Sequence, residues 1–193
     1  MSKCKVSFMF EFLPNSDLLE NGELSQKFKE FGLSSFHDAC DYVWKLPYGR
    51  TSDRCNWNLV LTEGKGACST KHALLKALAN ELGIDVDLVV GIYAMTGKNT
   101  PGVGEVLNTH GLDYIPEAHC YLMSNGIRVD LTRHGIETEE DICEFMLEQS
   151  IEPNGIGDEK QDLHKEFIKH EFGESEFDKV WAVRERCISA ISI

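Results

Sequence analysis

The stretch that most constrains the fold is AHCYLMSNGIRVDLT, residues 118–132, in which two runs of alternating polarity flank an Asn-Gly pair. Asn-Gly favours a two-residue type I′ turn between antiparallel strands. A turn at residues 125–126 sets the register, pairing Leu122 with Val129 and Cys120 with Leu131. One face of the predicted hairpin is then small or apolar, while the other carries His119, Tyr121, Met123, Arg128, Asp130 and Thr132.

The polar face brings a histidine next to an acid. In this register His119 and Asp130 are diagonal cross-strand neighbours, about 7 Å apart between Cα atoms. Their side chains can reach each other, so an imidazole–carboxylate hydrogen bond is possible. We therefore predict that His119 and Asp130 interact.

A cysteine stands at the start of the clearest helix. Residues 64–75 read GKGACSTKHALL, and the leucines at 74, 75, 78 and 82 predict a helix from Ser69 that stops at Gly83. Free N–H groups and the helix dipole at such a start stabilise a thiolate and can lower a thiol pKa to roughly 3.5 to 7.5. Cys68 is thus a candidate nucleophile. His119 would accept its proton and Asp130 would orient the imidazole.

The remaining pattern is that of an α+β chain forming one domain over residues 1–193. Alternating polarity predicts a strand at 6–12, and a continuous apolar run predicts a buried strand at 86–95. Residues 96–116 are rich in Gly, Pro and Asn and are expected to form an irregular loop, lid or binding segment. Helices are predicted at 22–31, 34–46, 138–149, 158–172 and 174–191.

Composition narrows the class of partner. Nineteen basic and 32 acidic residues give a net charge of −13 without a basic run, which argues against nucleic acid and anionic membranes as partners. No run approaches ~20 apolar residues, and the seven cysteines form no CxxC pair. We expect a cytoplasmic protein with reduced thiols; the oligomeric state is not predicted.

Other groups could contribute to a site. His72 lies one helical turn after Cys68, but a residue at i+4 on the same helix is poorly placed to act as a base. Residues 56–58, Asn-Trp-Asn, could assist an oxyanion, and Arg128 could anchor a substrate or simply be exposed. The Gly97-Lys98 pair lacks phosphate-loop spacing, and no HExxH or paired CxxC occurs, so we expect neither cofactor nor metal.

Two stretches carry a resemblance to a known family. Residues 64–93 (GKGACSTKHALLKALANELGIDVDLVVGIY) and 118–132 resemble the core of the transglutaminase-like superfamily, whose fold is related to papain. The similarity covers about residues 35–133, leaving 134–193 as a helical C-terminal extension. It implies a helix carrying Cys68 packed against an antiparallel sheet. It also implies that Cys68, His119 and Asp130 are nucleophile, base and orienting acid.

The resulting expectation is a cysteine hydrolase or acyltransferase acting on a peptide, protein or small amide substrate, with hydrolysis as the default. The alternative is a catalytically inactive binding module of the same fold that uses residues 96–116 as its contact surface. Arylamine acetyltransferase-like chemistry would need an acyl-CoA site, for which the sequence gives no sign.

Overall fold

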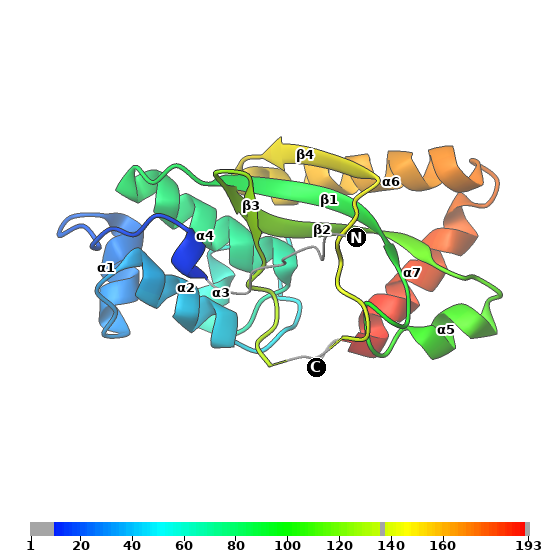
Figure 1. Cartoon of the computed structure of the whole chain (residues 1–193), viewed down its shortest axis with the longest axis horizontal. Helices are drawn as coiled ribbons and strands as arrows, with labels where there is room; N and C mark the ends of the chain where they lie inside the picture. Colours follow the sequence, from blue (N-terminus) through cyan, green and yellow to red (C-terminus); the bar gives the residue numbers. More distant parts are fainter. Residues whose placement is uncertain (1–9, 136–137, 192–193) are drawn as a thin grey trace.

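The computed structural model describes residues 10–135 and 138–191, and it is built around one antiparallel sheet (Figure 1). The strands follow the order β3-β2-β1-β4, and every neighbouring pair is antiparallel. Their bounds are β1 Asp87–Met95, β2 Ile115–Ser124, β3 Ile127–Val129 and β4 Leu147–Ile151. The chain is therefore α+β, as predicted.

Helices gather at both ends of the sheet. Figure 1 shows α1 and α2 at one end and α5 and α7 at the other, while α4 runs alongside the sheet. The α-helices are α1 Glu23–Glu30, α2 Phe36–Lys45, α3 Leu59–Glu63, α4 Cys68–Leu82, α5 Gly104–Thr109, α6 Asp158–Phe172 and α7 Phe177–Ile191, and the 3₁₀ turns are η1 Phe10–Phe12 and η2 Pro153–Ile156. The helices expected at 22–31, 34–46 and 158–172 are confirmed. The one expected at 174–191 is confirmed from Phe177, after a turn that follows Gly173.

The predicted hairpin is confirmed, and so is its register for the three pairs nearest the turn, but the expected pair of Cys120 and Leu131 is not part of the ladder. Leu122 pairs with Val129 and Ser124 with Ile127. The two turn residues, Asn125 and Gly126, have φ values of 50° and 74°, the left-handed region that a type I′ turn requires. The ladder ends at Val129, so Asp130 is positioned beyond the strand and needs other contacts to hold it.

The apolar face of this hairpin packs on α4. The leucines of the α4 stripe, at 74, 75 and 78, are completely buried in one cluster with the apolar side chains of β1 and β2. The helix ends at Gly83, whose φ of 68° is the left-handed conformation expected of a helix stop. A second cluster joins the far ends of β1 and β2 to α5, α6 and α7.

The strand predicted at 6–12 is wrong where the chain is described, and residues 6–9 lie outside the described range. Phe10–Phe12 is a 3₁₀ turn, closed by the Leu13 N–H donating to the Phe10 carbonyl at 2.9 Å. Because i and i+3 share one side of a 3₁₀ turn, Phe10 and Leu13 both reach the core, while Phe12 is 47% exposed.

The helix predicted at 138–149 is also wrong. Residues 138–146 are irregular, and the chain then forms β4 along the outer edge of β1. The open edge of β1 needs partners for its N–H and C=O groups, and this requirement overrides the helical pattern. The region after residue 134 is therefore not purely helical, because β4 belongs to the central sheet.

The segment at 96–116 is more ordered than predicted. It contains the short helix α5, and its last two residues, Ile115 and Pro116, already belong to β2. No helix within the described ranges is long and apolar enough to cross a membrane.

Candidate active site

Cys68 is the first residue of α4 and is buried, with 8% of its surface exposed. The preceding Ala67 has an extended backbone, and its side chain cannot accept a hydrogen bond, so it does not cap the N–H groups of the first turn. Gly66 allows the incoming loop to pass close to the helix, since a Cβ there would lie 2.8 Å from Lys71 Cγ. The helix start therefore presents partial positive charge beside the sulfur.

The environment of Cys68 favours its thiolate. The pKa of the Cys68 thiol lies well below its ordinary 9.0, most of all because the Cys120 thiol donates a hydrogen bond to the sulfur. Burial opposes this shift, but the positive charges of Lys160 and His119 reinforce it. Cys68 is thus set up as a nucleophile at neutral pH.

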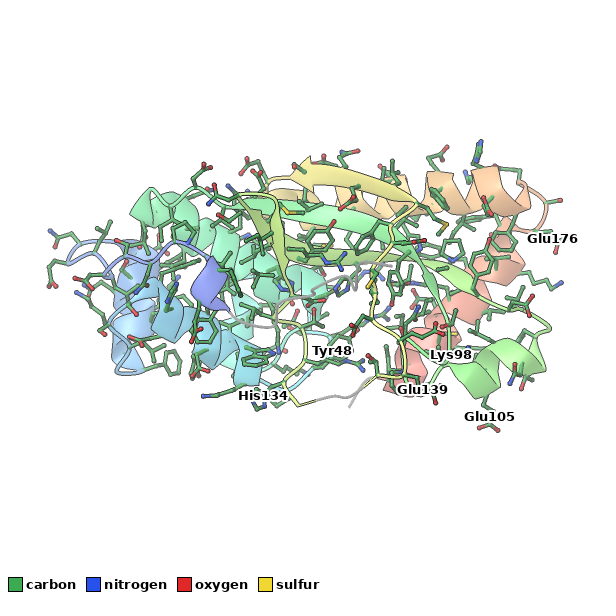
Figure 2. The ribbon with its side chains drawn as sticks, viewed as in Figure 1. Tyr48, Lys98, Glu105, His134, Glu139 and Glu176 are labelled. Atoms are coloured by element: carbon green, nitrogen blue, oxygen red, sulfur yellow. The ribbon has the colours of Figure 1, made fainter. Side chains whose placement is uncertain are left out.

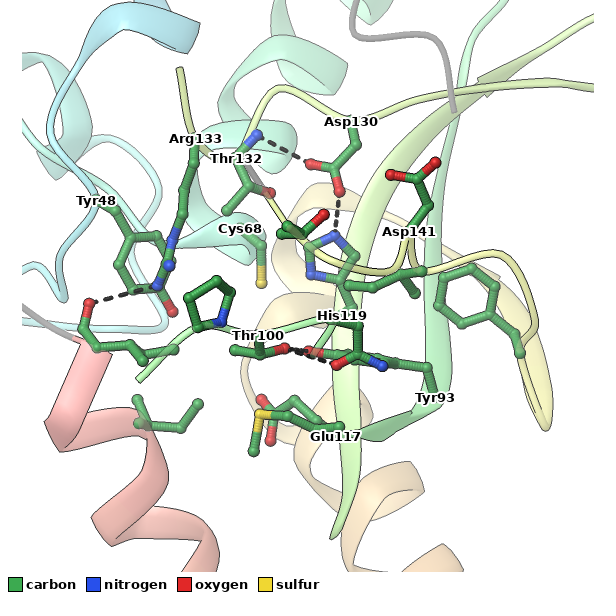
Figure 3. Close-up of a pocket in the computed structure, with 18 of the residues that line it drawn as sticks. Tyr48, Cys68, Tyr93, Thr100, Glu117, His119, Asp130, Thr132, Arg133 and Asp141 are labelled. Carbon is green, nitrogen blue, oxygen red and sulfur yellow. Dashed lines mark hydrogen bonds and ion pairs between the residues drawn. The ribbon is translucent and has the colours of Figure 1, made fainter. Parts of the chain in front are cut away.

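His119 and Asp130 form the predicted pair. His119 Nε2 lies 2.5 Å from Asp130 Oδ2, so the other ring nitrogen, Nδ1, remains for the Cys68 side (Figure 3). Beyond the end of β3, Asp130 is held by a second contact, because its Oδ1 accepts a hydrogen bond from the Thr132 N–H at 2.9 Å. The structure brings Cys68, His119 and Asp130 together.

Charge on the pair is mutually stabilised. Burial alone would lower the pKa of His119, but the carboxylate of Asp130 and then the Cys68 sulfur outweigh it and raise this pKa to about 10. Burial would likewise raise the pKa of Asp130, and the charge of His119 keeps it below its ordinary value. A thiolate–imidazolium pair supported by a carboxylate is the resulting state at neutral pH.

His72 supports the site and does not act as its base. The ring is completely buried, and its Nε2 accepts a hydrogen bond from the Leu131 N–H at 2.8 Å. Its Nδ1 must therefore carry the proton, which it donates to the Cys68 carbonyl at 2.8 Å. With both nitrogens engaged and its pKa lowered by burial, His72 is a neutral brace between α4 and the end of the hairpin.

Lys71 provides a second brace. Its side chain is completely buried, and Nζ donates to the carbonyls of Leu46 at 2.6 Å, Thr132 at 2.9 Å and Trp44 at 3.4 Å. Burial is the main reason that its pKa falls to about 8. This ammonium ties together the loop after α2, the start of α4 and the chain that follows Asp130.

A cavity of about 120 Å³ opens over the triad. Cys68, His119 and Asp130 line it together with aromatic and aliphatic side chains that include Tyr93, Phe145 and Ile142. Asn99, Thr100 and Pro101 also line it, so part of the stretch expected to be a contact surface lies at the triad. The Oγ1 of Thr132, another lining residue, is buried without a hydrogen-bond partner among the described residues.

Two segments close this cavity together. Residues 138–146 cross the polar face of the hairpin, where the Phe145 ring occupies the space left by Gly91; a Cβ at that glycine would lie 2.3 Å from the ring. The Glu139 N–H donates to the Lys98 carbonyl at 3.0 Å, and Figure 2 shows these two residues side by side. Arg128, weighed above as an anchor, stacks on Phe145 at 4.8 Å and donates to the Ile142 carbonyl, so it holds this segment in place.

Tyr48 is a site residue that the sequence reasoning missed. It lines the cavity over the triad, and its hydroxyl makes no hydrogen bond to a described residue. The pKa of its phenol is raised, chiefly by burial and then by the charge of Cys68, so it remains a donor. The expected oxyanion helpers at 56–58 line neither of the two cavities that Cys68 reaches, and Trp57 Nε1 instead donates to Asn154 Oδ1 at 3.2 Å. A tyrosine directly after Pro47 gives no local signal of such a role.

Comparison with family models, with curated proteins and with solved structures finds no match to this chain. Among the described residues, no three His, Cys, Asp or Glu side chains are grouped so that they could hold a metal ion.

Proposed function

We propose that this chain is a cysteine-dependent acyl-transfer enzyme with a transglutaminase-like core, acting on an amide or peptide bond. The observation that carries the proposal is the 2.5 Å contact between His119 Nε2 and Asp130 Oδ2, which directs the remaining ring nitrogen toward a thiol at a helix start. If Cys68, His119 and Asp130 only stabilised the fold, they would not need to form a thiolate–imidazolium pair supported by a carboxylate.

The first half of the reaction forms a thioester. The Cys68 thiolate attacks the carbonyl carbon, and the electron pair of the C=O bond moves to oxygen. The N–H of Cys68 and the Tyr48 hydroxyl are the donors available to that oxygen. Collapse of the intermediate breaks the C–N bond, and the His119 imidazolium gives its proton to the leaving nitrogen.

The second half releases the acyl group. Neutral His119 accepts a proton from an incoming water or amine, whose oxygen or nitrogen attacks the thioester carbonyl. The Cys68 thiolate leaves, and the imidazolium is restored. Asp130 keeps Nε2 protonated throughout, so that Nδ1 exchanges the proton. Hydrolysis is our default for the acceptor.

The test is acylation by p-nitrophenyl acetate, a generic acyl donor. We expect a burst of nitrophenolate, an acetyl group on Cys68 in peptide mass spectrometry, and loss of both in Cys68→Ser and His119→Gln. Cys55→Ser, which removes an exposed thiol, is the matched control and should leave the burst intact. Added methylamine separates the two acceptors, because transfer would yield N-methylacetamide and hydrolysis only acetate.

The inactive binding module predicts a different result. In that case Cys68 would be acylated no faster than the buried thiol Cys187, and replacing His119 would change nothing. That outcome would refute the proposed enzyme.

A further inference from the structure

Cys68 lines a second cavity, of about 70 Å³, on the side of α4 that faces α6 and α7. This cavity and the one over the triad share Tyr48, Cys68, Glu117 and Ile188 in their walls. A substrate whose scissile bond lies at the Cys68 sulfur would therefore have one cavity on each side of that bond. The two cavities differ in chemistry, because several basic side chains line the second.

Four cations line the second cavity: Arg50, Arg54, Lys160 and Arg184. In a chain with net charge −13, such a concentration is a departure from the average surface. Cations at a small cavity raise the local concentration of anions and attract them from solution.

Two of these cations are compensated by carboxylates. Arg184 donates to Glu117 through Nε at 2.7 Å and Nη2 at 2.5 Å, and both side chains are buried. Arg50 NH1 lies 3.0 Å from Glu185 Oε2, and Arg184 also reaches Glu185, at 2.6 Å. Two arginines thus face two carboxylates, and their charges balance.

The other two cations have no ion pair with a carboxylate of the described residues. Arg54 donates through Nη2 to the amide oxygen of Gln161 at 3.1 Å, and Arg54 has no ion pair among the described residues. Lys160, half-buried on α6, makes no hydrogen bond or ion pair to a described residue, although its charge acts on Cys68 and Glu117. Lys160 faces the Cys68 thiolate and Arg54 is exposed to water, so both cations are available to a carboxylate that a bound molecule brings.

The hydroxyl of Ser69 also lines the second cavity. Ser69 is 8% exposed, and its Oγ makes no hydrogen bond to a described residue. It belongs to the first turn of α4, which adds N–H groups without a side-chain cap. An ammonium, a guanidinium, a hydroxyl and these N–H groups are all hydrogen-bond donors, and together they suit an oxyanion.

The geometry points to a substrate anion site: Lys160, Arg54 and Ser69 bind a carboxylate that the acyl substrate carries close to its scissile carbonyl. The inference rests on the proposed function, because it names the class of substrate that Cys68 attacks. A carboxylate would pair with Lys160 and Arg54, whereas an amide of the same size would bring them no negative charge. Substrates with a free acid next to the reacting bond are therefore preferred over their amides.

The test compares two alkylating reagents that differ only in this charge. Iodoacetate and iodoacetamide both form an S–C bond at Cys68 and expel iodide, but only iodoacetate brings a carboxylate. We expect the ratio of the two rate constants, iodoacetate over iodoacetamide, to exceed that of N-acetylcysteine. In Lys160→Gln the ratio should fall by about fivefold or more, the effect of one nearby charge in a partly screened site. Any change in thiolate population affects both reagents equally and cancels in the ratio.

Two further variants make the result specific. Lys160→Arg keeps the charge and should retain the high ratio. Lys179→Gln removes an exposed lysine of α7, paired only with Glu176, and should leave the ratio unchanged. If Lys160→Gln has the wild-type ratio, the anion site is refuted. The proposed function fails separately, if iodoacetamide alkylates Cys68 no faster than it alkylates N-acetylcysteine at neutral pH.

Discussion

Replacing Asp130 by Asn tests how far one carboxylate controls the charge state of the site. The amide has the same shape, and its Oδ1 can still accept from the Thr132 N–H, so the end of the hairpin should keep its conformation. What disappears is the negative charge 2.5 Å from His119 Nε2.

The size of the effect follows from the pKa of His119. Its rise from 6.5 to about 10 corresponds to about 5 kcal/mol in favour of the imidazolium. Asp130 is the largest of the groups that raise this pKa, while burial, which lowers it, is unchanged in the variant. We therefore expect the pKa of His119 to fall by about two units or more.

The variant also changes which nitrogen carries the proton. An Asn amide donates to Nε2, so the neutral ring must place its hydrogen on Nδ1, the nitrogen that faces Cys68. That tautomer cannot accept a proton from the nucleophile's side, and deacylation should slow by about a thousandfold. The thiol pKa rises at the same time, because Cys68 loses the charge of His119.

The assay is the rate constant of Cys68 alkylation by iodoacetamide as a function of pH. The wild-type profile should show a lower inflection for the thiol and an upper one near pH 10 for His119, with the ion pair between them. In Asp130→Asn the pH range between the two inflections should narrow, because the pKa of Cys68 rises and that of His119 falls. The control is Asp141→Asn, which removes a carboxylate that lines the same cavity but has no contact to His119. An upper inflection that stays near pH 10 in Asp130→Asn would refute the reasoning.

Three further predictions concern the groups around the triad. Gly91→Ala should cost about 1–3 kcal/mol of unfolding free energy in urea and should expose Cys68 to bulky maleimides, because its Cβ displaces Phe145; unchanged maleimide rates would contradict this. His72→Leu leaves the buried N–H of Leu131 without an acceptor and should cost about 2 kcal/mol or more in the same assay, whereas a cost under about 0.5 kcal/mol would exclude the brace. His164, whose pKa burial lowers to about 4, favours the folded state fully above its unfolded value of 6.5 and progressively less as the pH falls toward 4. The wild type should therefore lose about 2 kcal/mol more than His164→Gln between pH 7 and pH 5, and equal losses would show that the ring does not titrate as described.

The parts that the sequence predicts well are those set by local rules. The hairpin is predictable because Asn125 and Gly126 select one turn and the turn selects one register. Helix α4 is predictable because its leucine stripe and Gly83 agree on the same ends. Once the hairpin and α4 are predicted, the triad requires only that these two elements pack on each other, because Cys68 lies on α4 and His119 and Asp130 lie on the hairpin.

The parts that it misses depend on distant partners. β4 forms because the edge of β1 is open, and neither the charges nor the spacing within 138–149 report that edge. Phe10–Phe12 alternates in polarity like a strand, but among the described residues it pairs with no strand of the sheet. Tyr48 lies 20 residues before Cys68 and Lys160 lies 92 residues after it, yet both line the second cavity beside the sulfur, so no motif in the chain joins them to Cys68.

The buried ammonium of Lys71 has a consequence for the chain during synthesis. Of the carbonyls that accept from its Nζ, that of Leu46 is synthesised before α4 and that of Thr132 long after it. Lys71 can therefore bind both only when the hairpin has left the ribosome and packed on α4. Until then the cysteine also lacks its histidine and its helix cannot be held in place, and the thiol has the ordinary pKa of about 9. In a nascent or misfolded chain Cys68 therefore reacts with electrophiles no faster than an ordinary cysteine does. The reactive thiolate exists only in molecules that have finished folding.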